Sequence, residues 1–563
     1  MRWKSKPIPN EDSLSLLQNQ IGVSRNISII LTQRGINNFE SAKSFFRPQL
    51  DDLHDPFLMK DMKFATDRIN QAINNQEKIL IYGDYDVDGV ASTALLTTFL
   101  RQKTANVFSY IPDRKTEGYG ISISGIEKAF KEGVSLIISI DCGIKAVEEI
   151  KYAKSNNIDF IICDHHLPES KIPNAVAVLD PKRNDCEYPF KDLCGCGIGF
   201  KLIQALCLEW SIDTQHLTNY LDLVSLATAA DQVSLSEENR VITHLGLRQI
   251  NENPRPGIKA LLSDFKEHEI TSSTLVFKLS PKVNAAGRLK HASLALELLL
   301  CEKIEDTVTL SEKIRLINAK RKAKDKKTTE EALKQIKDKE EEFFSSTLVY
   351  NDNWHPGVLG IVASRLIENY YRPTIVLTKR DKYYIGSARS IKGFDIYKAL
   401  KKCHKFLEQF GGHKYAAGLK LHESNIELFR IEFEKFANKN ISENQKIKTS
   451  TYDLEIPLSD LNPKFFKIIK QMGPFGPNNL EPIFFTRDCT STSQTRSVGT
   501  ENKHLQVHIR SKNKTYRGIA FGKGHLVDQI KKSEGFDIFY SLRESTWSGN
   551  TELKLDIKDL MVK

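Results

Sequence analysis

The chain has 563 residues, of which 40% are hydrophobic and 27% are charged. This length excludes a single ordinary hydrophobic core, so three or more domains are expected, and the composition is that of a soluble globular protein. Lys and Arg number 81 against 71 Asp and Glu, which gives a formal net charge of +10. A basic surface suits a polyanion, but net charge alone does not establish a nucleic-acid partner.

The sequence shows no targeting or membrane segment. The start, from Met1 to Pro7, lacks an apolar core, and no apolar run reaches the length that a bilayer requires. Nine cysteines without a paired framework indicate reduced thiols. We therefore expect a cytoplasmic protein with no membrane partner. Cys186, Cys194 and Cys196 resemble half of a zinc knuckle, but no Cys/His pair follows at ligand spacing, so a structural or incidental role is favoured.

An acidic junction follows the first clear strand. Residues 1–75 mix short helical patterns with breaks and show no chemistry, whereas residues 79–83 form an apolar run that ends at a glycine. Asp84, Asp86 and Asp88 follow at every second position, before a helix-like segment over 90–100. Carboxylates this close repel one another and need protons or a divalent cation. The alternative is a helix N-cap with solvated acids.

Strands and helices then alternate, which predicts a doubly wound, parallel α/β sheet. Strand-like runs cover 107–111, 135–140 and 159–163, and helical stretches cover 122–131 and 145–156. Asp141 follows the second of these strands, Asp164-His165-His166 follows the third, and Asp231 ends an apolar helix-like run over 217–230.

Each of these residues taken singly has an ordinary interpretation, as a turn residue, a core histidine or an acid at a helix end. Together, a mixed Asp/His set at strand ends is the ligand chemistry of a two-metal phosphoryl-transfer site that uses Mn²⁺ or Mg²⁺.

The order of these motifs carries a family resemblance. Asp86-x-Asp88-Gly89, Asp141, Asp164-His165-His166 and Asp231 resemble the motifs of the DHH phosphoesterase superfamily. Within it, the chain is similar to the RecJ family of single-strand-specific 5′→3′ exonucleases at four stretches: 83–89, 281–288, 411–418 and 473–477. The match covers nearly the whole chain in the family's order.

The resemblance implies two ions. Their implied ligands are Asp88, Asp141, His165 and Asp231 for one ion, and Asp86 and Asp141 for the other. Asp141 would bridge the ions, and His166 would lie beside the scissile phosphate, so His166, Asp141 and Asp88 are the expected catalytic residues. Many relatives carry a histidine four residues before the first Asp of the Asp-x-Asp pair, where this chain has Tyr82. We expect Asp84 to substitute as a ligand.

The resemblance also implies the domain order. We expect a helical leader packed on the DHH domain (1–75), the DHH domain (76–300), a long connecting helix (301–344), a smaller α/β DHHA1 domain (345–442) and an OB-like β-barrel (446–563). The helix carries a basic stretch over 319–327, which is read either as a solvated face or as the lining of a substrate groove. In the last segment, period-2 alternation over 504–510 and further short strands predict the barrel, with aromatic residues either stacking on single-strand bases or half-buried in it.

Four further residues are expected to bind substrate. Arg288, after an expected turn over 284–287, and Ser387 with Arg389 match positions that the resemblance implies hold a 5′-phosphate, and His413 follows a Gly-Gly pair as a phosphate donor. The alternative for either arginine is an interdomain salt bridge.

The resemblance implies a metal-dependent exonuclease that degrades single-stranded DNA from its 5′ end to mononucleotides in DNA repair and recombination. A single-strand-binding protein and a helicase are further expected partners. One rival is another DHH phosphodiesterase that acts on oligoribonucleotides or cyclic dinucleotides, which the length and the barrel oppose. The other is a non-catalytic replication scaffold, which the intact set of acids and histidines opposes.

Overall fold

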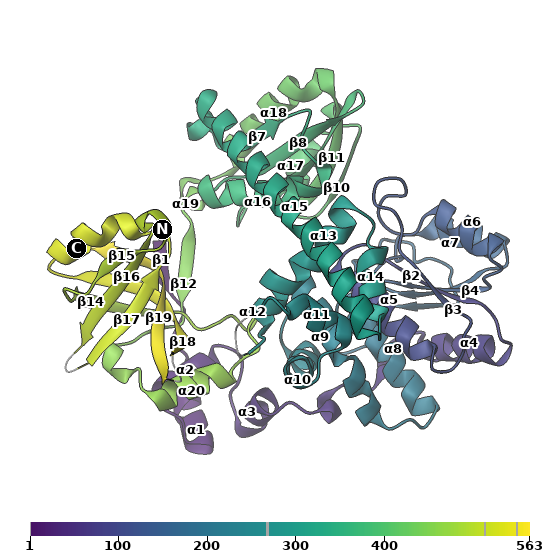
Figure 1. The fold of residues 1–563 in the computed structure, drawn as a ribbon, viewed down its shortest axis with the longest axis horizontal. Coiled ribbons are helices and arrows are strands. Elements are labelled where there is room, and N and C mark those ends of the chain that lie inside the picture. Colours follow the sequence, from purple (N-terminus) through teal and green to yellow (C-terminus); the bar gives the residue numbers. More distant parts are fainter. Residues whose placement is uncertain (1, 266–268, 512–513, 548–549) are drawn as a thin grey trace. The chain divides into compact units, whose positions relative to one another are not determined.

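The computed structural model describes residues 2–265, 269–511, 514–547 and 550–563 (Figure 1). The chain divides into two compact units: residues 281–449 form the central unit, and residues 3–280 with 450–563 form the α/β–barrel unit. Throughout the described residues, every helix is too short or too polar to cross a bilayer.

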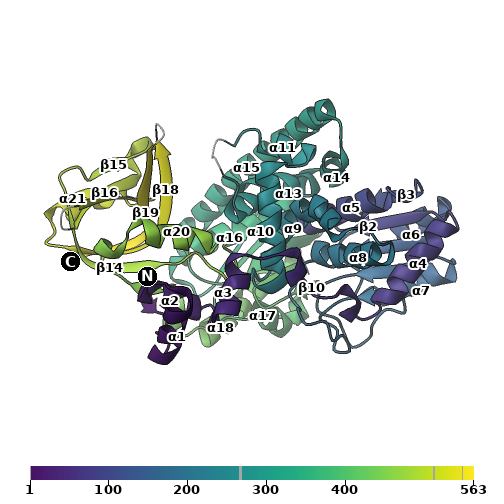
Figure 2. The same cartoon turned by 90° about the horizontal axis from the view of Figure 1, so that it is seen from below.

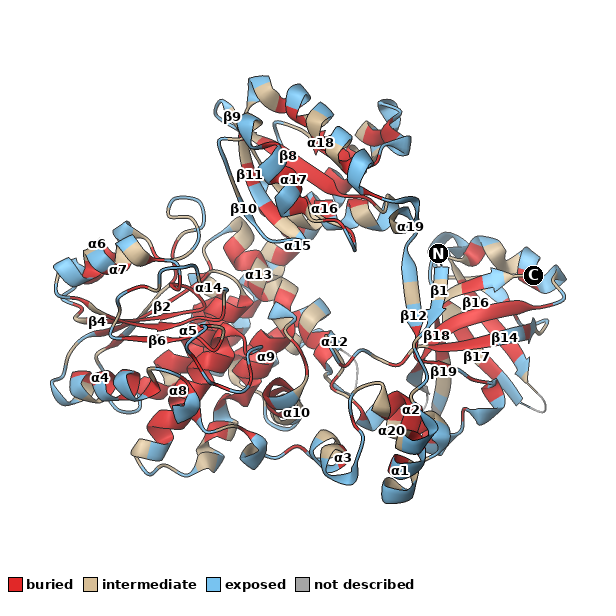
Figure 3. Ribbon diagram, turned by 180° about the vertical axis from the view of Figure 1, so that it is seen from behind, coloured by how far each residue is buried: buried red, intermediate tan, exposed pale blue. Residues whose placement is uncertain are grey.

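A five-stranded parallel sheet organises the α/β domain, in the order β3-β2-β4-β5-β6. Its strands are β2 (Ile79–Gly83), β3 (Val107–Tyr110), β4 (Leu136–Ile140), β5 (Asp159–Cys163) and β6 (Ala177–Leu179). Figure 3 shows most of this sheet buried with helices around it; the edge strand β3 is more exposed, since Val107 is its one buried residue. The predicted parallel sheet is confirmed. Only β6 was not anticipated, because three residues are too short to show a period.

Helices cover both faces of this sheet, because alternate strand residues point to opposite sides. Leu80 and Tyr82 share a core with α6 (Ile123–Lys131) and α7 (Val147–Ser155). On the other face, α5 (Val87–Leu100) and α8 (Gly195–Glu209) lie against the strands, α9 (Leu221–Asp231) packs on these two helices, and α10 (Glu237–Glu252) packs on α9. The helices over 122–131 and 145–156 and the helix ending near Asp231 are therefore confirmed.

The register of the sheet fixes where the strands end. Gly83 is paired with Ile140, Ile140 with Cys163, and Cys163 with Leu179. An aspartate follows each of these four residues: Asp84, Asp141, Asp164 and Asp180. The sheet thus brings four carboxyl groups to one edge, where ligands bind in open α/β sheets.

The central unit contains a second, mixed sheet in the order β10-β11-β9-β8-β7. Its strands are β7 (Thr347–Tyr350), β8 (Thr374–Arg380), β9 (Tyr383–Arg389), β10 (Gln409–Gly412) and β11 (Ala416–His422). Its main helices are α13 (Ser280–Leu289), α14 (Ser293–Leu300), α15 (Ile304–Asp338), α16 (Leu359–Asn369), α17 (Ile396–Lys402) and α18 (Ile426–Asn440). The long helix is confirmed as α15. The turn expected over 284–287 is wrong, because α13 runs through these residues.

The C-terminal residues close into a barrel (Figure 2). Strands β14 (Phe484–Ser491), β18 (Phe536–Trp547), β19 (Asn550–Val562), β17 (Lys514–Ala520) and β16 (His504–Ser511) pair in this order, and β14 also pairs β16. That last pairing removes both edges of the five-stranded sheet. Most aromatic side chains of the barrel, such as Tyr516 and Tyr540, lie in its core. Phe521 is an exception: it is exposed and its ring lies 5.0 Å from that of His504.

The first helices share a hydrophobic cluster with the barrel. Helices α1 (Glu11–Ile21), α2 (Arg25–Thr32) and α3 (Phe39–Phe46) contribute buried side chains to one hydrophobic cluster with the barrel strands and α20 (Pro463–Gln471). The second half of the leader contacts the α/β domain: α4 (Met62–Asn74) lies against α8 and β6, and Phe45 in α3 contacts Arg240 in α10. The expected packing of the whole leader on the DHH domain is therefore wrong for its first half. The sequence of an amphipathic helix shows which of its faces is buried, but it does not show which domain that face contacts.

This shared core gives a stability prediction. Leu17 is fully buried and its neighbour Leu16 is 50% exposed. Leu17→Ala should cost about 2–5 kcal/mol and lower the urea midpoint of the transition that unfolds the barrel, because it leaves a cavity in a core common to both segments. Leu16→Ala is the matched control and should change that midpoint little. Equal midpoints for the two variants would contradict the shared core.

Candidate active site

Ligand atoms of eight side chains gather at the carboxyl edge of the parallel sheet. Three groups have ligand atoms within 4.8 Å of one another: Asp84, Asp86 and Asp141; Asp88, His165 and Asp231; and Asp141, His165 and His166. The eighth is Asp164, which bonds the backbone N–H groups of the turn that carries both histidines. Every residue predicted from the sequence to bind metal is in one of the three groups.

Backbone N–H groups hold the Asp-x-Asp pair. Asp86 accepts hydrogen bonds from the N–H groups of Asp88 (2.9 Å) and Gly89 (3.3 Å), so it is the N-cap of α5. Asp88 accepts from Gly195 (2.7 Å) and Cys196 (2.8 Å) in the first turn of α8. The cap interpretation is thus correct for Asp86 but incomplete, since its carboxylate also belongs to the group of Asp84 and Asp141.

Asp141 lies on a strained turn. Its φ of 62° is in the left-handed region, which an L residue adopts only when its surroundings impose it. Its N–H donates to the carbonyl of Cys163 at 2.9 Å. Gly195 packs on it so closely that a Cβ there would lie 2.6 Å from the Cβ of Asp141. Gly195 therefore serves both carboxylates: it donates its N–H to Asp88 and leaves room for Asp141.

Burial and mutual repulsion raise the pKa values of these acids. Burial, followed by the charges of Asp88 and Asp86, raises the pKa of Asp141 well above its ordinary value. Burial and Asp86 raise the pKa of Asp84 to about 8. The side chain of Asp231 keeps 31% exposure, but partial desolvation and the charge of Asp88 raise its pKa to about 8 as well. A cluster of this kind gains most from a bound cation.

The donor atoms fit a divalent ion. Carboxylate oxygens with imidazole nitrogen suit Mn²⁺ or Mg²⁺. Burial lowers the pKa of His165 to about 4, so its imidazole is neutral and has a lone pair to offer at pH 7. Its Nε2 lies 3.2 Å from Asp141 and 3.8 Å from Asp88. Within the described residues, Asp84 Oδ1 and His165 Nδ1 are buried and lack hydrogen-bond partners, which is expected of atoms that await a ligand.

His166 is held by contacts that the sequence did not reveal. Its Nδ1 lies 2.7 Å from Asp164 Oδ1, and its Nε2 lies 3.1 Å from the hydroxyl of Tyr119. Burial opposes the charged form, but the hydrogen bond to Asp164 raises the pKa of His166 overall. Tyr119 stands in a polar loop with no local signal of chemistry, so only the fold places it here.

Tyr82 and Asp180 also lie at or below this edge of the sheet. Tyr82 is fully buried below it, where its hydroxyl donates to the carbonyl of Gly120 and accepts from the N–H of Ser122, so it supports the loop that bears Tyr119. Asp180 follows the unanticipated strand β6. Burial raises its pKa to about 7, and its Oδ2 has no partner among the described residues.

The predicted phosphate-binding residues converge in the central unit, around the turn that leads into α16. Arg288 Nη1 donates to the carbonyl of Gly357 at 3.3 Å. A Cβ at Gly360, in the first turn of α16, would lie 2.6 Å from Arg389 Nη2 and 3.5 Å from Ser387 Oγ. Helix N-termini favour anions.

Arg389 has the environment expected of an anion-binding residue. Burial lowers its pKa, and no acidic side chain offsets that effect. Among the described residues its side chain donates to the carbonyl of Ala388 and forms no ion pair with an acid. The interdomain salt bridge considered for it is therefore not observed there. His413 is exposed nearby: its N–H donates to Ala416, which is paired with Arg389 across β11 and β9.

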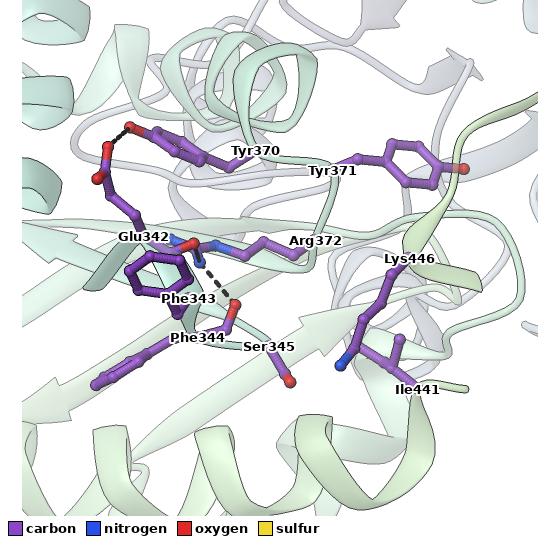
Figure 4. A pocket seen from close by; sticks show the side chains of 9 residues that line it. All are labelled: Glu342, Phe343, Phe344, Ser345, Tyr370, Tyr371, Arg372, Ile441 and Lys446. Carbon is purple, nitrogen blue, oxygen red and sulfur yellow. Dashed lines mark hydrogen bonds between the residues drawn. The ribbon is translucent and has the colours of Figure 1, made fainter. Parts of the chain in front are cut away.

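The central unit also contains a separate hollow of about 280 Å³ (Figure 4), and none of its lining residues belongs to a metal-ligand group or to the predicted phosphate-binding set. It is lined by Glu342, Phe343, Phe344, Ser345, Tyr370, Tyr371, Arg372, Ile441 and Lys446. Arg372 donates through Nη1 to the carbonyls of Glu342 and Phe344 and through Nε to Thr347, while its Nη2 is buried and has no partner among the described residues. These bonds tie together the segments that enter β7 and β8, which is a structural role.

Comparison with known proteins agrees with this arrangement. The DHH family N-terminal domain matches residues 78–228, the DHHA1 domain matches 340–439, and the RecJ OB domain matches 452–559. The single-stranded-DNA-specific exonuclease RecJ of Bacillus subtilis (strain 168) is 36% identical over 568 residues, which is 100% of this chain and 71% of that protein.

A second relative and a solved structure also match this chain over most of its length. RecJ of Salmonella typhimurium is 32% identical over 88% of this chain and 89% of its own length. The crystal structure of RecJ in complex with Mn²⁺ from Thermus thermophilus matches with a TM-score of 0.86 and 25% identity, over 100% of this chain and 79% of that one.

The raised pKa values predict how the metal-free protein responds to pH. An acid whose pKa rises from 3.8 to about 8 on folding makes the folded state bind more protons, so stability is lost as pH rises from about 4 towards 8. In EDTA the thermal midpoint should fall between pH 6 and 8, and Mn²⁺ should reverse the fall. Asp231→Asn should flatten the metal-free profile.

Glu127→Gln is the control for that measurement, because it removes one exposed carboxylate from α6. Its profile should match that of the unmodified chain. Circular dichroism at matched ionic strength gives the midpoints. A profile for Asp231→Asn as steep as that of the unmodified chain would contradict the electrostatic account.

Proposed function

The chain belongs to the RecJ family of single-stranded-DNA-specific exonucleases, and on that premise we propose that it hydrolyses single-stranded DNA from the 5′ end to mononucleotides, in DNA repair and recombination. The observation that carries the proposal is the convergence of the three ligand groups at one edge of the sheet. A single-strand-binding protein and a helicase would be its partners, and the cytoplasm its location.

We propose that two ions occupy this edge. Asp88, His165 and Asp231 with Asp141 would hold one ion, and Asp84 and Asp86 with Asp141 would hold the other. When bound, Mn²⁺ or Mg²⁺ supplies Lewis-acid stabilisation of the phosphoryl charge and lowers the pKa of water. The bridging role falls to Asp141, because it is the carboxylate that occurs in a group with Asp84 and in another with His165.

His166 would act on the scissile phosphate. Asp164 fixes the orientation of the ring through Nδ1 and favours the cation, so Nε2 can donate to a phosphoryl oxygen in place of Tyr119. The ring is one-third exposed, in contrast to His165 at 8%, which suits a substrate contact for the first and a ligand for the second. The two adjacent histidines therefore have different proposed roles because their environments differ.

Strand polarity needs a separate element, because in-line hydrolysis has no sense of chain direction. We propose that Arg288, Ser387 and Arg389 bind the terminal 5′-phosphate at the start of α16, with His413 beside them. The half-buried guanidinium of Arg389, which has no acidic partner among the described residues, supports this role. The closed barrel supports binding of a longer strand through surface groups such as Phe521, which is exposed, and its half-buried neighbour His504.

The rival functions are less well supported. A phosphodiesterase for dinucleotides needs no barrel of this size, and a non-catalytic scaffold needs no complete ligand set. The discriminating assay uses single strands of DNA and RNA, labelled at the 5′ or the 3′ end, with Mn²⁺ or Mg²⁺. Release of labelled mononucleotide from the 5′ end of DNA at the earliest times supports the proposal, and initial release from the 3′ end contradicts its polarity.

Replacement of the bridging ligand tests the two-ion site. Asp141→Ala should abolish cleavage, because it removes bonds to both ions, while the metal-free protein stays folded, since one repelling buried acid is gone. Cleavage rates and circular dichroism measure the two effects. Turnover within tenfold of the unmodified chain would rule out the bridging assignment.

A second variant tests the phosphate-binding residues. Arg389→Ala should lower the rate on 5′-phosphorylated strands by about ten- to a hundredfold, because a charge-assisted hydrogen bond is lost, and should change the rate on 5′-hydroxyl strands much less. Arg389→Lys should restore part of the difference, since it supplies charge without the planar fork. Lys392→Ala, an exposed cation on the same unit, is the control. An unchanged phosphate-to-hydroxyl ratio in Arg389→Ala would place end recognition elsewhere.

A further inference from the structure

A loop of the C-terminal segment packs on the turn that follows Asp231. This loop, residues 473–479, lies between α20 and the first barrel strand, in the same compact unit as the α/β domain. The carbonyl of Pro477 accepts the N–H of Leu235 at 2.8 Å, and Asn478 Nδ2 donates to Ser234 Oγ at 2.8 Å. A Cβ at Gly476 would lie 2.6 Å from Leu235, so the two surfaces are in direct contact.

The 473–479 loop is itself well fixed. Asn479 is buried, and its amide donates to the carbonyls of Met472 (2.9 Å) and Pro474 (2.8 Å). Gly476 and Asn479 exchange two backbone hydrogen bonds of 3.0 Å. Arg34, from the N-terminal helices, donates to Asn479 Oδ1 at 3.2 Å. A loop with this many internal bonds can impose its position on a neighbour.

A buried arginine anchors the same contact from the α/β side. Arg240 on α10 is 4% exposed and donates to the carbonyls of Met472 (3.0 Å) and Gly473 (2.9 Å). Its guanidinium also stacks on Phe45, with 3.6 Å between the charge centre and the ring centroid. Its Nε donates to the carbonyl of Phe45 (2.9 Å), so detaching the loop would leave the two Nη groups of a buried cation without these acceptors.

The turn between α9 and α10 depends on such support. Asp231 is the last residue of α9, and Gln232 and Glu237 have φ values of 56° and 43°, in the left-handed region that L side chains disfavour. Two such residues within six positions persist only where tertiary contacts hold them. Ser234 and Leu235, between them, are the residues that the loop binds. The segment that follows Asp231 therefore contains two disfavoured backbone conformations, and the loop contacts it between them.

We propose that the 473–479 loop holds Asp231 in position to bind its divalent ion, with Asn478 as a positioning residue. The inference rests on the proposed function in one respect, that Asp231 is a metal ligand. It adds that the α/β domain does not complete this ion site by itself: the C-terminal segment of the chain supplies part of the support. Outer contacts of this kind alter metal affinity because they orient the ligands.

Mn²⁺ binding by the full chain in the absence of DNA tests the proposal. Asn478 has a φ of 61°, so Asn478→Gly removes the amide without straining the backbone. Asn502→Gly is the matched control, because Asn502 also has a positive φ of 55° and is exposed on the barrel. Calorimetric titration should show one ion bound about tenfold more weakly in Asn478→Gly. The control should bind as the unmodified chain does.

Two more variants make every outcome decisive. Asp231→Ala should lose one bound ion. If it does not, the ligand assignment fails and the positioning role fails with it. If it does, but Asn478→Gly binds both ions within twofold of the control, only the positioning role is overturned. Ser234→Ala breaks the same hydrogen bond from the α/β side, so it should reproduce the tenfold weakening even if circular dichroism shows that Asn478→Gly is misfolded. Ser236→Ala is its control, because it removes only the Ser234–Ser236 hydroxyl contact and should leave Mn²⁺ binding unchanged.

Discussion

Repulsion among buried carboxylates is the constraint on which this structure depends. Asp84, Asp88 and Asp141 are each at most 3% exposed, and each carries a raised pKa caused first by burial. No folding benefit comes from placing such groups together, so the surrounding structure must hold them. It does so with backbone N–H groups from Gly195 and Cys196, with a helix cap at Asp86, and with a left-handed turn at Asp141. Carboxylate repulsion lowers the stability of the metal-free fold, and a bound cation would relieve this repulsion. The same repulsion therefore favours cation binding.

Much of the α/β fold could be predicted, because its signals are local. Buried parallel strands read as apolar runs, and a carboxylate after each run must lie at the same edge once the strands are parallel. This reasoning places Asp84, Asp141 and Asp164 together without coordinates. It does not find Asp180, because β6 has three residues, nor Tyr119, whose contact with His166 joins residues 47 positions apart. The helix through residues 284–287 was missed because small residues and a glycine also favour turns.

Long-range packing is where sequence patterns stop being informative. The amphipathic helices α1 to α3 show a buried face, and nothing in that face distinguishes the α/β domain from a barrel more than 400 residues later. Likewise, the stretch 473–477 is recognisable as a family motif, yet its role as a contact with Ser234 and Leu235 is visible only in three dimensions. Local chemistry predicts which residues can bind metal. Tertiary contacts determine how firmly they are held.

The packing of the N-terminal helices on the barrel bears on the metal site. Arg34 sits on the segment that follows α2, and it reaches Asn479, the carbonyl of Leu480 and the carboxylate of Asp453, all on the C-terminal side. Phe45, in α3, stacks on Arg240 and accepts its hydrogen bond through the backbone. The 473–479 loop is therefore held from two directions, by the first helices and by α10. Because this loop contacts the segment after Asp231, the early helices are linked to the proposed ion site through the loop, although none of their described residues belongs to a ligand group.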